Sequence, residues 1–471
     1  MRNQDTIAAI ATAQGEGGIA IVRISGPGAQ KALEAVFERQ LGTKGQAGEA
    51  SDPAEARTAG KPEEAFIRHL VHSPWQPNRL YYGHIMEGGR TVDEAMAVLM
   101  AAPRSYTRED VGEIHVHGGR YAAQKALELV LKQGVRVAQP GEFTLRAFLN
   151  GRIDLSQAEA VMGMIAAGSE SAARAAARQL EGSLGGFVEQ ISNRLTDMLA
   201  MIEAGVDFPE EVDEHATAEE LKDGICRMIS ELQEAVDERA ARIVREGLTV
   251  AIAGAPNAGK SSLMNALLKS DRAIVTSVPG TTRDVLSERL RVGGLDITIL
   301  DTAGLRETSD EIEREGVERA KRAIASADVV LLVLDGSIPE GEPERELLLE
   351  ADERYLIALN KCDLGVAPGR VGLYVSAKTN EGVEDLLNEL SRRAGFFEAA
   401  EERLTQPRHI DCAKRAIDSL GSALEGLEDG LSPDFASVDL MAALNALYEI
   451  TGRSAADDVI EAVFRNFCVG K

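Results

Sequence analysis

The sequence predicts a multidomain fold with an α/β N-terminal domain, a discontinuous all-α helical domain, and an α/β nucleotide-binding domain inserted between the two helical parts. Three observations support this prediction. Strand and helix patterns mix at the N-terminus, long helical patterns occur both before and after the centre, and a buried apolar run in the centre leads into a glycine-rich loop. The expected boundaries are 1–150, 151–246, 247–395 and 396–471.

The N-terminal domain should alternate strands and helices. Strands are expected at 18–27, 81–86, 92–100 and 111–117, and helices at about 28–39 and 121–132. The stretch from Gln40 to Pro62 is rich in Gly, Ala, Glu and Ser, which predicts a loose loop or insertion.

The helical domain is expected in two pieces. Helical periodicity rich in Ala, Glu, Leu and Arg predicts long packed helices at 155–164, 169–184, 187–204 and 218–244, and again at 409–427, 437–450 and up to 466. Because helical sequence flanks the central domain on both sides, we expect that domain to be an insertion.

The central domain carries a phosphate-binding loop. The segment Gly254–Ser261 fits the pattern G-x-x-x-x-G-K-[ST], between a strand at 248–253 and a helix at 261–269. In such a loop, backbone N–H groups and a helix N-terminus surround phosphate oxygens, Lys260 adds a positive charge, and the Ser261 hydroxyl can ligate Mg²⁺.

Four further motifs follow in order and predict a Ras-like P-loop GTPase domain. The Asp301 carboxylate ends a strand and can hold the Mg²⁺ shell, while Gly304 can sense the γ-phosphate. The Asp363 carboxylate can accept hydrogen bonds from guanine N1 and N2. The Ser376 segment would reach guanine O6, and Thr281–Thr282 lies where a switch-one threonine belongs. The expected GTP-binding residues are Asn257, Ala258, Gly259, Lys260, Ser261, Ser262, Thr276, Ser277, Val278, Pro279, Gly280, Thr281, Thr282, Asp301, Thr302, Ala303, Gly304, Asn360, Lys361, Asp363, Ser376, Ala377 and Lys378.

Whole-chain composition limits the classes of protein that fit. The 471 residues suffice for about three domains, and the formal charge of −25 means that an RNA substrate would need a local basic surface. No apolar run is long enough to span a bilayer, and the first residues are polar, so no secretory signal is expected. Four scattered cysteines without a C-x-x-C pattern fit a reducing, cytoplasmic location.

Motifs outside the central domain carry a specific resemblance. They are Asp5–Thr12, Arg23–Gly26, Gly141–Arg152 and the terminal Phe467–Lys471. Together with the GTPase motifs, they make the chain resemble the bacterial and organellar tRNA modification GTPases called MnmE or TrmE, over nearly its whole length. Val469, where the family often has isoleucine, and the long 40–62 segment are the departures.

The resemblance implies a function. The family acts with the FAD-dependent MnmG (GidA) protein on certain tRNAs, and adds an aminomethyl or carboxymethylaminomethyl group at carbon 5 of the wobble uridine. The one-carbon unit comes from 5-formyl-tetrahydrofolate or a related folate, and GTP hydrolysis drives a conformational change. A homodimer through the N-terminal domain is implied in the same way.

The resemblance also implies a folate site. Arg23, Glu113 and Arg152 match positions where the family binds a formyl-folate, although position 152 is often lysine in relatives. Lys471 is a further possible folate ligand, and Cys468 is expected near the one-carbon site. The competing interpretation is that Arg23 and Glu113 are ordinary strand-end charges and that Cys468 is simply packed. His115 and His117 share a strand face but lack a third metal ligand.

Hydrolysis needs a group other than the Ras-type glutamine, because Leu305 follows Asp-x-x-Gly. Glu313 matches the family's catalytic glutamate and would orient or polarise the attacking water. The residues alone leave the choice open, since the same stretch also contains Glu307, Asp310, Glu311 and Glu315.

The positive charge at the transition state also needs a source. Arg283 and Arg306 are candidate arginine fingers. The alternative is potassium, held by the Asn257 amide oxygen and by backbone carbonyls of the loop 276–282. The family places K⁺ there, with Asn257, Thr276, Val278 and Thr281 around it and with Ser261 and Thr282 on Mg²⁺. Closure of this loop should also favour pairing of two GTPase domains.

Two other functions share the GTPase motifs. A ribosome-assembly GTPase would be expected to carry basic RNA-binding appendages, which this acidic chain does not suggest. A folate-sensing regulatory GTPase would carry out no chemistry on RNA. Measuring wobble-uridine modification in a strain without the protein separates these hypotheses.

Overall fold

The computed structural model describes residues 5–13, 15, 17–40, 75–208, 210, 214–269, 274–275, 287–292, 295–301, 321–349, 351–395, 404–465 and 467–470. The chain divides into two compact units. The first comprises residues 1–159 together with 455–471, and the second comprises residues 160–454. The segment 40–62, expected to be a loop, lies almost wholly outside the described residues.

The first unit is built on a mixed seven-stranded sheet in the order β3-β4-β5-β6-β2-β1-β7. Its strands are β1 (Ile7–Ile10), β2 (Ile19–Ser25), β3 (Phe37–Arg39), β4 (Leu80–Glu87), β5 (Arg90–Met100), β6 (Val111–His117) and β7 (Arg136–Val137). Its helices include α1 (Ala29–Val36), α3 (Arg120–Leu131), α4 (Glu142–Leu149) and α16 (Asp457–Arg465). The expected helix at 28–39 ends early, because Phe37–Arg39 pairs with β4 instead.

The C-terminal helix α16 belongs to this first unit, whereas the sequence analysis placed residues 396–471 together in the helical domain. Rings of Phe148, Phe464 and Phe467 pack in series, with centroid separations of 6.2 and 5.2 Å. Because Phe464 and Phe467 are buried, the apolar contact holds the end of the chain on α4.

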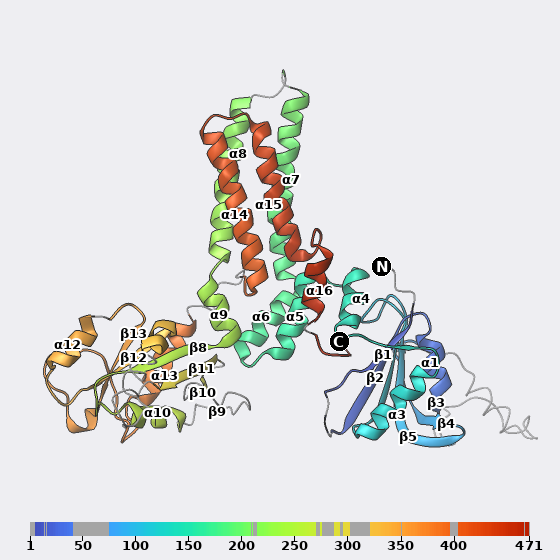
Figure 1. The fold of residues 1–471 in the computed structure, drawn as a ribbon, viewed down its shortest axis with the longest axis horizontal. Helices are drawn as coiled ribbons and strands as arrows, with labels where there is room; N and C mark the ends of the chain where they lie inside the picture. The colour runs from blue at the N-terminus through green and yellow to red at the C-terminus, as the bar shows by residue number, and fades with distance from the viewer. Residues whose placement is uncertain are drawn as a thin grey trace, which may run out of the picture. The chain divides into compact units, whose positions relative to one another are not determined.

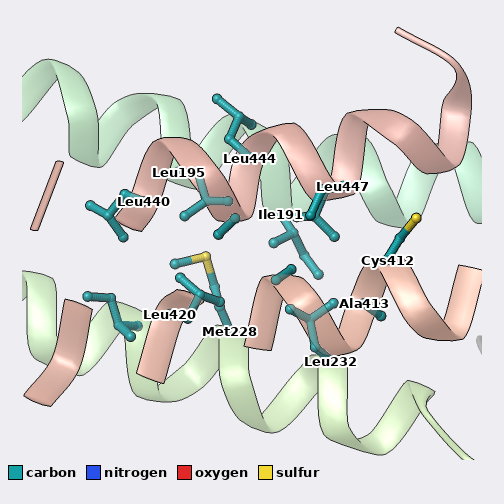
Figure 2. Packing of buried hydrophobic residues seen from close by; sticks show 14 of the residues in the cluster. Ile191, Leu195, Met228, Leu232, Cys412, Ala413, Leu420, Leu440, Leu444 and Leu447 are labelled. Atoms are coloured by element: carbon teal, nitrogen blue, oxygen red, sulfur yellow. The ribbon is translucent and has the colours of Figure 1, made fainter. Parts of the chain in front are cut away.

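The helical domain forms a four-helix bundle within the second unit (Figure 1). It consists of α7 (Ser183–Asp207), α8 (Glu214–Ala235), α14 (Pro407–Glu428) and α15 (Pro433–Thr451). Figure 2 shows Ile191, Leu195, Met228, Leu420 and Leu444 meeting in its core. Because α7 and α8 precede the central domain and α14 and α15 follow it, the predicted discontinuous helical domain with an inserted domain is confirmed.

Shorter helices connect the bundle to its neighbours. They are α5 (Leu155–Ala166), α6 (Glu170–Glu181) and α9 (Glu238–Glu246). The sequence predicts one helix over 218–244, but two helices form there. The Asp237 side chain accepts a hydrogen bond from the Ala240 N–H at 2.8 Å, which caps the start of α9 and interrupts the run.

The inserted domain is a second seven-stranded sheet in the order β14-β13-β12-β8-β11-β10-β9. The strands are β8 (Leu248–Ala253), β9 (Ile274–Val275), β10 (Ser287–Val292), β11 (Leu295–Asp301), β12 (Val329–Asp335), β13 (Tyr355–Asn360) and β14 (Leu373–Tyr374). The helices are α10 (Lys260–Leu268), α12 (Glu342–Leu349) and α13 (Val383–Gly395), with a 3-10 turn, η2, at Cys362–Leu364. Strands β14, β13, β12, β8 and β11 are parallel, and β10 and β9 continue the sheet antiparallel, as the Ras-like fold class requires.

Candidate functional site

The nucleotide site is built at one edge of the inserted domain's sheet. The parallel strands β8, β11, β12 and β13 end at Ala253, Asp301, Asp335 and Asn360. Carboxyl ends of neighbouring parallel strands meet at the same edge, where ligands of α/β proteins bind. The sequence motifs, which are far apart along the chain, are therefore brought together there.

The phosphate loop has a backbone that only certain residues can adopt. Gly254 and Gly259 have φ values of 141° and 91°, and a Cβ on Gly254 would lie 2.1 Å from the Val333 carbonyl oxygen. Asn257 also has a positive φ, 65°, a region that asparagine tolerates better than most residues. The Lys260 ammonium donates to the Gly254 and Ala255 carbonyls at 2.8 and 2.9 Å. The lysine thus lies over the loop that precedes its helix, α10.

The Asn360 side chain joins the phosphate loop to the loop that contains Ala377. It is 2% exposed, its Nδ2 donates to the Ala258 carbonyl at 2.8 Å, and its Oδ1 accepts from the Ala377 N–H at 3.0 Å. Both polar atoms of the Asn360 amide are therefore hydrogen-bonded. This one buried group positions the phosphate loop, the end of β13 and the loop at Ala377 relative to one another.

The Asp363 carboxylate, which the sequence predicts to recognise guanine, is held by a serine. The Ser376 hydroxyl, buried at the end of the β14 segment, donates to Asp363 Oδ1 at 2.7 Å and accepts from the Thr379 N–H at 3.2 Å. An ionised carboxylate has about four acceptor positions, so one serine contact leaves capacity for the two N–H donors of a guanine edge.

Asp335, which the sequence analysis did not single out, pairs with a residue of the Asn360 motif. Its Oδ2 accepts from the Lys361 ammonium at 2.6 Å, and Lys361 has a left-handed backbone with φ 66°. Burial alone would raise the pKa of Asp335, but hydrogen bonds from Lys361 and Ser337 outweigh burial and hold this pKa below its usual value. Its position in the sequence could have identified Asp335, because this residue ends a buried strand just as Asp301 and Asn360 do.

We expect Asp335→Asn to weaken GTP and GDP binding equally, by roughly fivefold, because the Lys361 side chain loses its charged partner and must be ordered on binding. Equilibrium binding of fluorescent GTP and GDP measures this effect, and kcat at saturating GTP should stay unchanged. The exposed Asp352, paired with Arg354 in the turn before β13, provides the control Asp352→Asn, which should bind like wild type. Unchanged affinity in Asp335→Asn would contradict this role.

A second cluster lies in the first unit, around Arg23. Arg23 on β2 and Glu113 on β6 are directly paired in the sheet register, and Arg23 Nε donates to Glu113 Oε1 at 2.9 Å. The guanidinium lies 5.3 and 5.8 Å from the ring centroids of Tyr106 and Phe143. A hydrogen bond with His115 and the charge of Arg23 hold the pKa of Glu113 below its usual value despite burial, so this carboxyl stays ionised near neutrality.

The C-terminal tail reaches the Arg23 cluster. Arg23 Nη1 donates to the Gly470 carbonyl at 3.3 Å, and the Gly141 N–H donates to the Cys468 carbonyl at 3.3 Å. Gly470 has φ 97°, and a Cβ there would lie 2.4 Å from the Ile10 carbonyl. The backbone of the exposed Cys468 is therefore held at Gly141, two residues before the Gly470 that contacts Arg23, although it is 445 positions from Arg23 in sequence.

Arg152 joins the same cluster through Tyr106. Its guanidinium lies 4.7 Å from the Tyr106 ring centroid, and its Nη1 donates to the Tyr106 carbonyl at 3.1 Å. Arg23 and Arg152 thus both stack on one tyrosine. The sequence analysis missed Tyr106 and Phe143, because Tyr106 lies in an irregular loop and Phe143 resembles an ordinary core residue.

Several predicted site residues lie outside the described residues or are described only in part. The residues outside the described part of the chain are Lys471, Glu313, the candidate arginine fingers Arg283 and Arg306, and the stretches 276–282 and 302–304. Asp301 is described only as the end of strand β11. Among the described residues, no three His, Cys, Asp or Glu side chains gather as a metal site. His115 and His117 instead pair with Glu113 and Asp93.

The phosphate loop, the linked base-recognition loops and the strand order define a Ras-like P-loop GTPase. Comparisons with known families then extend this class to the whole chain. A model described as the MnmE helical domain matches residues 155–468, and one described as the GTP-binding protein TrmE N-terminus matches residues 6–152. The chain belongs to the tRNA modification GTPase MnmE family.

Curated relatives support this assignment over the full length. The tRNA modification GTPase MnmE of Syntrophotalea carbinolica is 44% identical over 486 residues and covers 100% of both chains. That of Symbiobacterium thermophilum is 42% identical, covering 99% of this chain and 100% of its own. That of Geobacter sulfurreducens is 41% identical and covers 99% of each.

Solved structures that are similar to this chain cover part of it. The G domain of the T. maritima FeoB iron transporter is 28% identical, covers 31% of this chain and 98% of its own, and has a TM-score of 0.24. Era from Aquifex aeolicus is 22% identical, covers 36% of this chain and 66% of its own, and has a TM-score of 0.25. Separately, none of the helices in the described part of the chain is long and apolar enough to cross a membrane.

Proposed function

We propose that this chain is the GTP-hydrolysing subunit of a tRNA wobble-uridine modification complex. The complex would add a (carboxymethyl)aminomethyl group at carbon 5, using a one-carbon unit from 5-formyl-tetrahydrofolate or a related folate. Its partners would be the FAD-dependent MnmG protein and tRNA, and the chain would act in the cytoplasm as a homodimer. GTP with Mg²⁺ would bind at the inserted domain, and the folate at the Arg23 cluster.

The observation that carries the proposal is the convergence of Arg23, Glu113, Arg152 and Tyr106 with the C-terminal tail. A pterin edge needs a carboxylate acceptor, its ring needs an aromatic or guanidinium plane, and folate carboxylates need guanidinium partners. The cluster supplies all three kinds of group, and the backbone of Cys468 is bonded to Gly141 at its edge. An ordinary strand-end ion pair would not require the chain's last residues to fold onto it.

The direct test uses a strain that lacks the gene. We expect its tRNA to lose the C5 modification at the wobble uridine, measured by mass spectrometry of purified nucleosides, and a plasmid copy to restore it. Normal modification without the protein would contradict the proposed function. Accumulation of ribosomal subunit precursors with normal modification would instead support a ribosome-assembly GTPase.

For hydrolysis, we propose Glu313 as the residue that orients the attacking water. Glu313→Ala should lower kcat at least about 100-fold, a loss of the size seen when one group acting in the transition state is removed, with little change in GTP affinity. Single-turnover hydrolysis and nucleotide binding measured on the same preparation separate the two effects. Glu311→Ala is the matched control, and a kcat loss in that variant alone would assign the role to Glu311.

For charge at the transition state, we propose K⁺ beside Asn257, acting by fixed electrostatic stabilisation. Hydrolysis should be faster in KCl than in NaCl at equal ionic strength, because Na⁺ is smaller and is held poorly by oxygens spaced for K⁺. Asn257→Ala should abolish the difference. Asn257→Gly should abolish it without backbone strain, since glycine tolerates the φ of 65° at this position. Equal rates in both salts would leave Arg283 and Arg306 as the candidate sources of positive charge.

A further inference from the structure

Helix α15 has apolar side chains on two faces. Its inward face packs in the bundle core through Ala436, Leu440, Ala443, Leu444 and Leu447. Its outward face carries Phe435, Val438 and Met441, which are 64, 72 and 47% exposed. The outward residues recur every third position and so share one face. The same helix also exposes Asp434 and Asn445, so its outward side is mixed rather than wholly apolar. Large apolar side chains grouped on one exposed helix face mark a contact surface, which indicates that this part of α15 is covered in the working protein.

More exposed apolar side chains lie at the same end of the bundle. Val206 and Phe208, at the end of α7, are 60 and 58% exposed, and Leu431, between α14 and α15, is 51% exposed. Figure 1 shows that the end of α7 and the α14–α15 connection lie at one end of the bundle. We call these residues the tip face: Val206, Phe208, Leu431, Phe435, Val438 and Met441.

The stretches of sequence that carry the tip face contain acidic but no lysine or arginine side chains. The sequence from 195 to 221 and from 416 to 452 contains no lysine or arginine. Acidic residues in these two stretches that the structure describes as exposed include Asp197, Glu203, Asp207, Glu425, Glu428, Asp429 and Asp434. Like charges without counter-charges repel one another and attract a basic surface.

We infer that the tip face is a docking site for a protein whose contact surface has apolar side chains surrounded by lysine and arginine. The apolar residues would supply the buried centre of the interface and the carboxylates its rim. Phosphates of tRNA would be repelled by this rim, and so would the same face of a second copy. Assigning the docked protein as the flavoprotein subunit rests on the proposed function.

A site-specific crosslink tests which molecule binds. Benzoylphenylalanine would replace Val438 in the full-length chain, which would then be irradiated with the purified flavoprotein subunit, with tRNA and GTP present. We expect a crosslink to the flavoprotein, at a peptide rich in lysine or arginine. Crosslinks to tRNA or to a second copy, with none to the flavoprotein, would overturn the inference.

Affinity measurements give the second readout. Val438→Glu, which adds a carboxylate and removes an apolar contact, should weaken flavoprotein binding at least about tenfold, and wild-type affinity should fall as salt rises. Leu349→Glu is the control, because Leu349 is 86% exposed on α12 of the inserted domain and should change neither binding nor hydrolysis. GTP hydrolysis of Val438→Glu should equal that of wild type, which verifies folding.

The possible failures are distinguishable. If Val438→Glu binds the flavoprotein with wild-type affinity, the tip face is not its docking site, whatever the cellular function. If wild-type protein binds no flavoprotein, the inference fails together with the partner assignment. Loss of wobble modification in the deletion strain remains an independent measurement of the proposed function.

Discussion

Gly259→Ala is expected to reduce GTP affinity at least about 100-fold. Alanine at a φ of 91° is strained, and its Cβ would lie 2.3 Å from Asn360 Nδ2. Asn360 cannot retreat without losing its hydrogen bonds to Ala258 and Ala377. Strain and a broken buried hydrogen bond each cost on the order of 1–3 kcal/mol, and 2.7 kcal/mol corresponds to a factor of about 100. Equilibrium binding of fluorescent GTP measures the loss.

The matched control is Gly421→Ala, in the interior of α14, where an added Cβ would meet no atom within 4 Å. This variant should bind GTP like wild type, and its unfolding free energy should rise by about 0.5–1 kcal/mol, because glycine is a poor helix former. The Gly259 variant should keep wild-type helical circular dichroism, since the bundle has a separate core. Wild-type GTP affinity in Gly259→Ala would show that this loop geometry is not needed for binding.

Arg23→Ala is expected to weaken binding of 5-formyl-tetrahydrofolate at least about tenfold and to abolish wobble modification while leaving GTP hydrolysis intact. The substitution removes the Glu113 ion pair, the stacking on Tyr106 and the contact with the Gly470 carbonyl together. Each is a charge-assisted or cation–π contact worth about 0.5–3 kcal/mol when partly buried. Isothermal titration with the folate measures the affinity directly.

Arg79→Ala is the control for this experiment. Arg79 also lies in the first unit and stacks on a tyrosine, Tyr81 at 5.5 Å, but it is exposed and belongs to a different segment. It should bind folate like wild type. A folate affinity that is unchanged in Arg23→Ala, or equally reduced in Arg79→Ala, would refute the Arg23 cluster as the folate site.

The positions of the phosphate loop and of the Asn360 motif at the ends of strands were predictable from sequence, because both are short motifs. The phosphate loop, the Asp301 motif and the Asn360 motif each follow a recognisable apolar strand. Parallel strands put their carboxyl ends at one edge, so local patterns were enough to predict the assembly. Asp335 was not predicted as a site residue, because its partner Lys361 is distant in sequence and no motif links the two residues.

The helical domain shows where local pattern fails. Periodicity predicted the long helices well, because an amphipathic stripe is a property of a single segment. It did not predict the break between α8 and α9, where Asp237 caps a new helix. Periodicity also did not predict the position of α16. That position depends on the packing of Phe464 and Phe467 against Phe148, which lies more than 300 residues earlier in the sequence.

The sequence by itself determined the class of the inserted domain, the discontinuous helical domain and the family, because strand, loop and helix signals are local and the family motifs are contiguous. Only the tertiary structure decided what those motifs touch. It brought the last residues of the chain onto Arg23, set Asn360 between the phosphate and base loops, and left one face of α15 exposed. These outcomes depend on packing between distant segments, and such packing energies are not encoded in any one stretch of sequence.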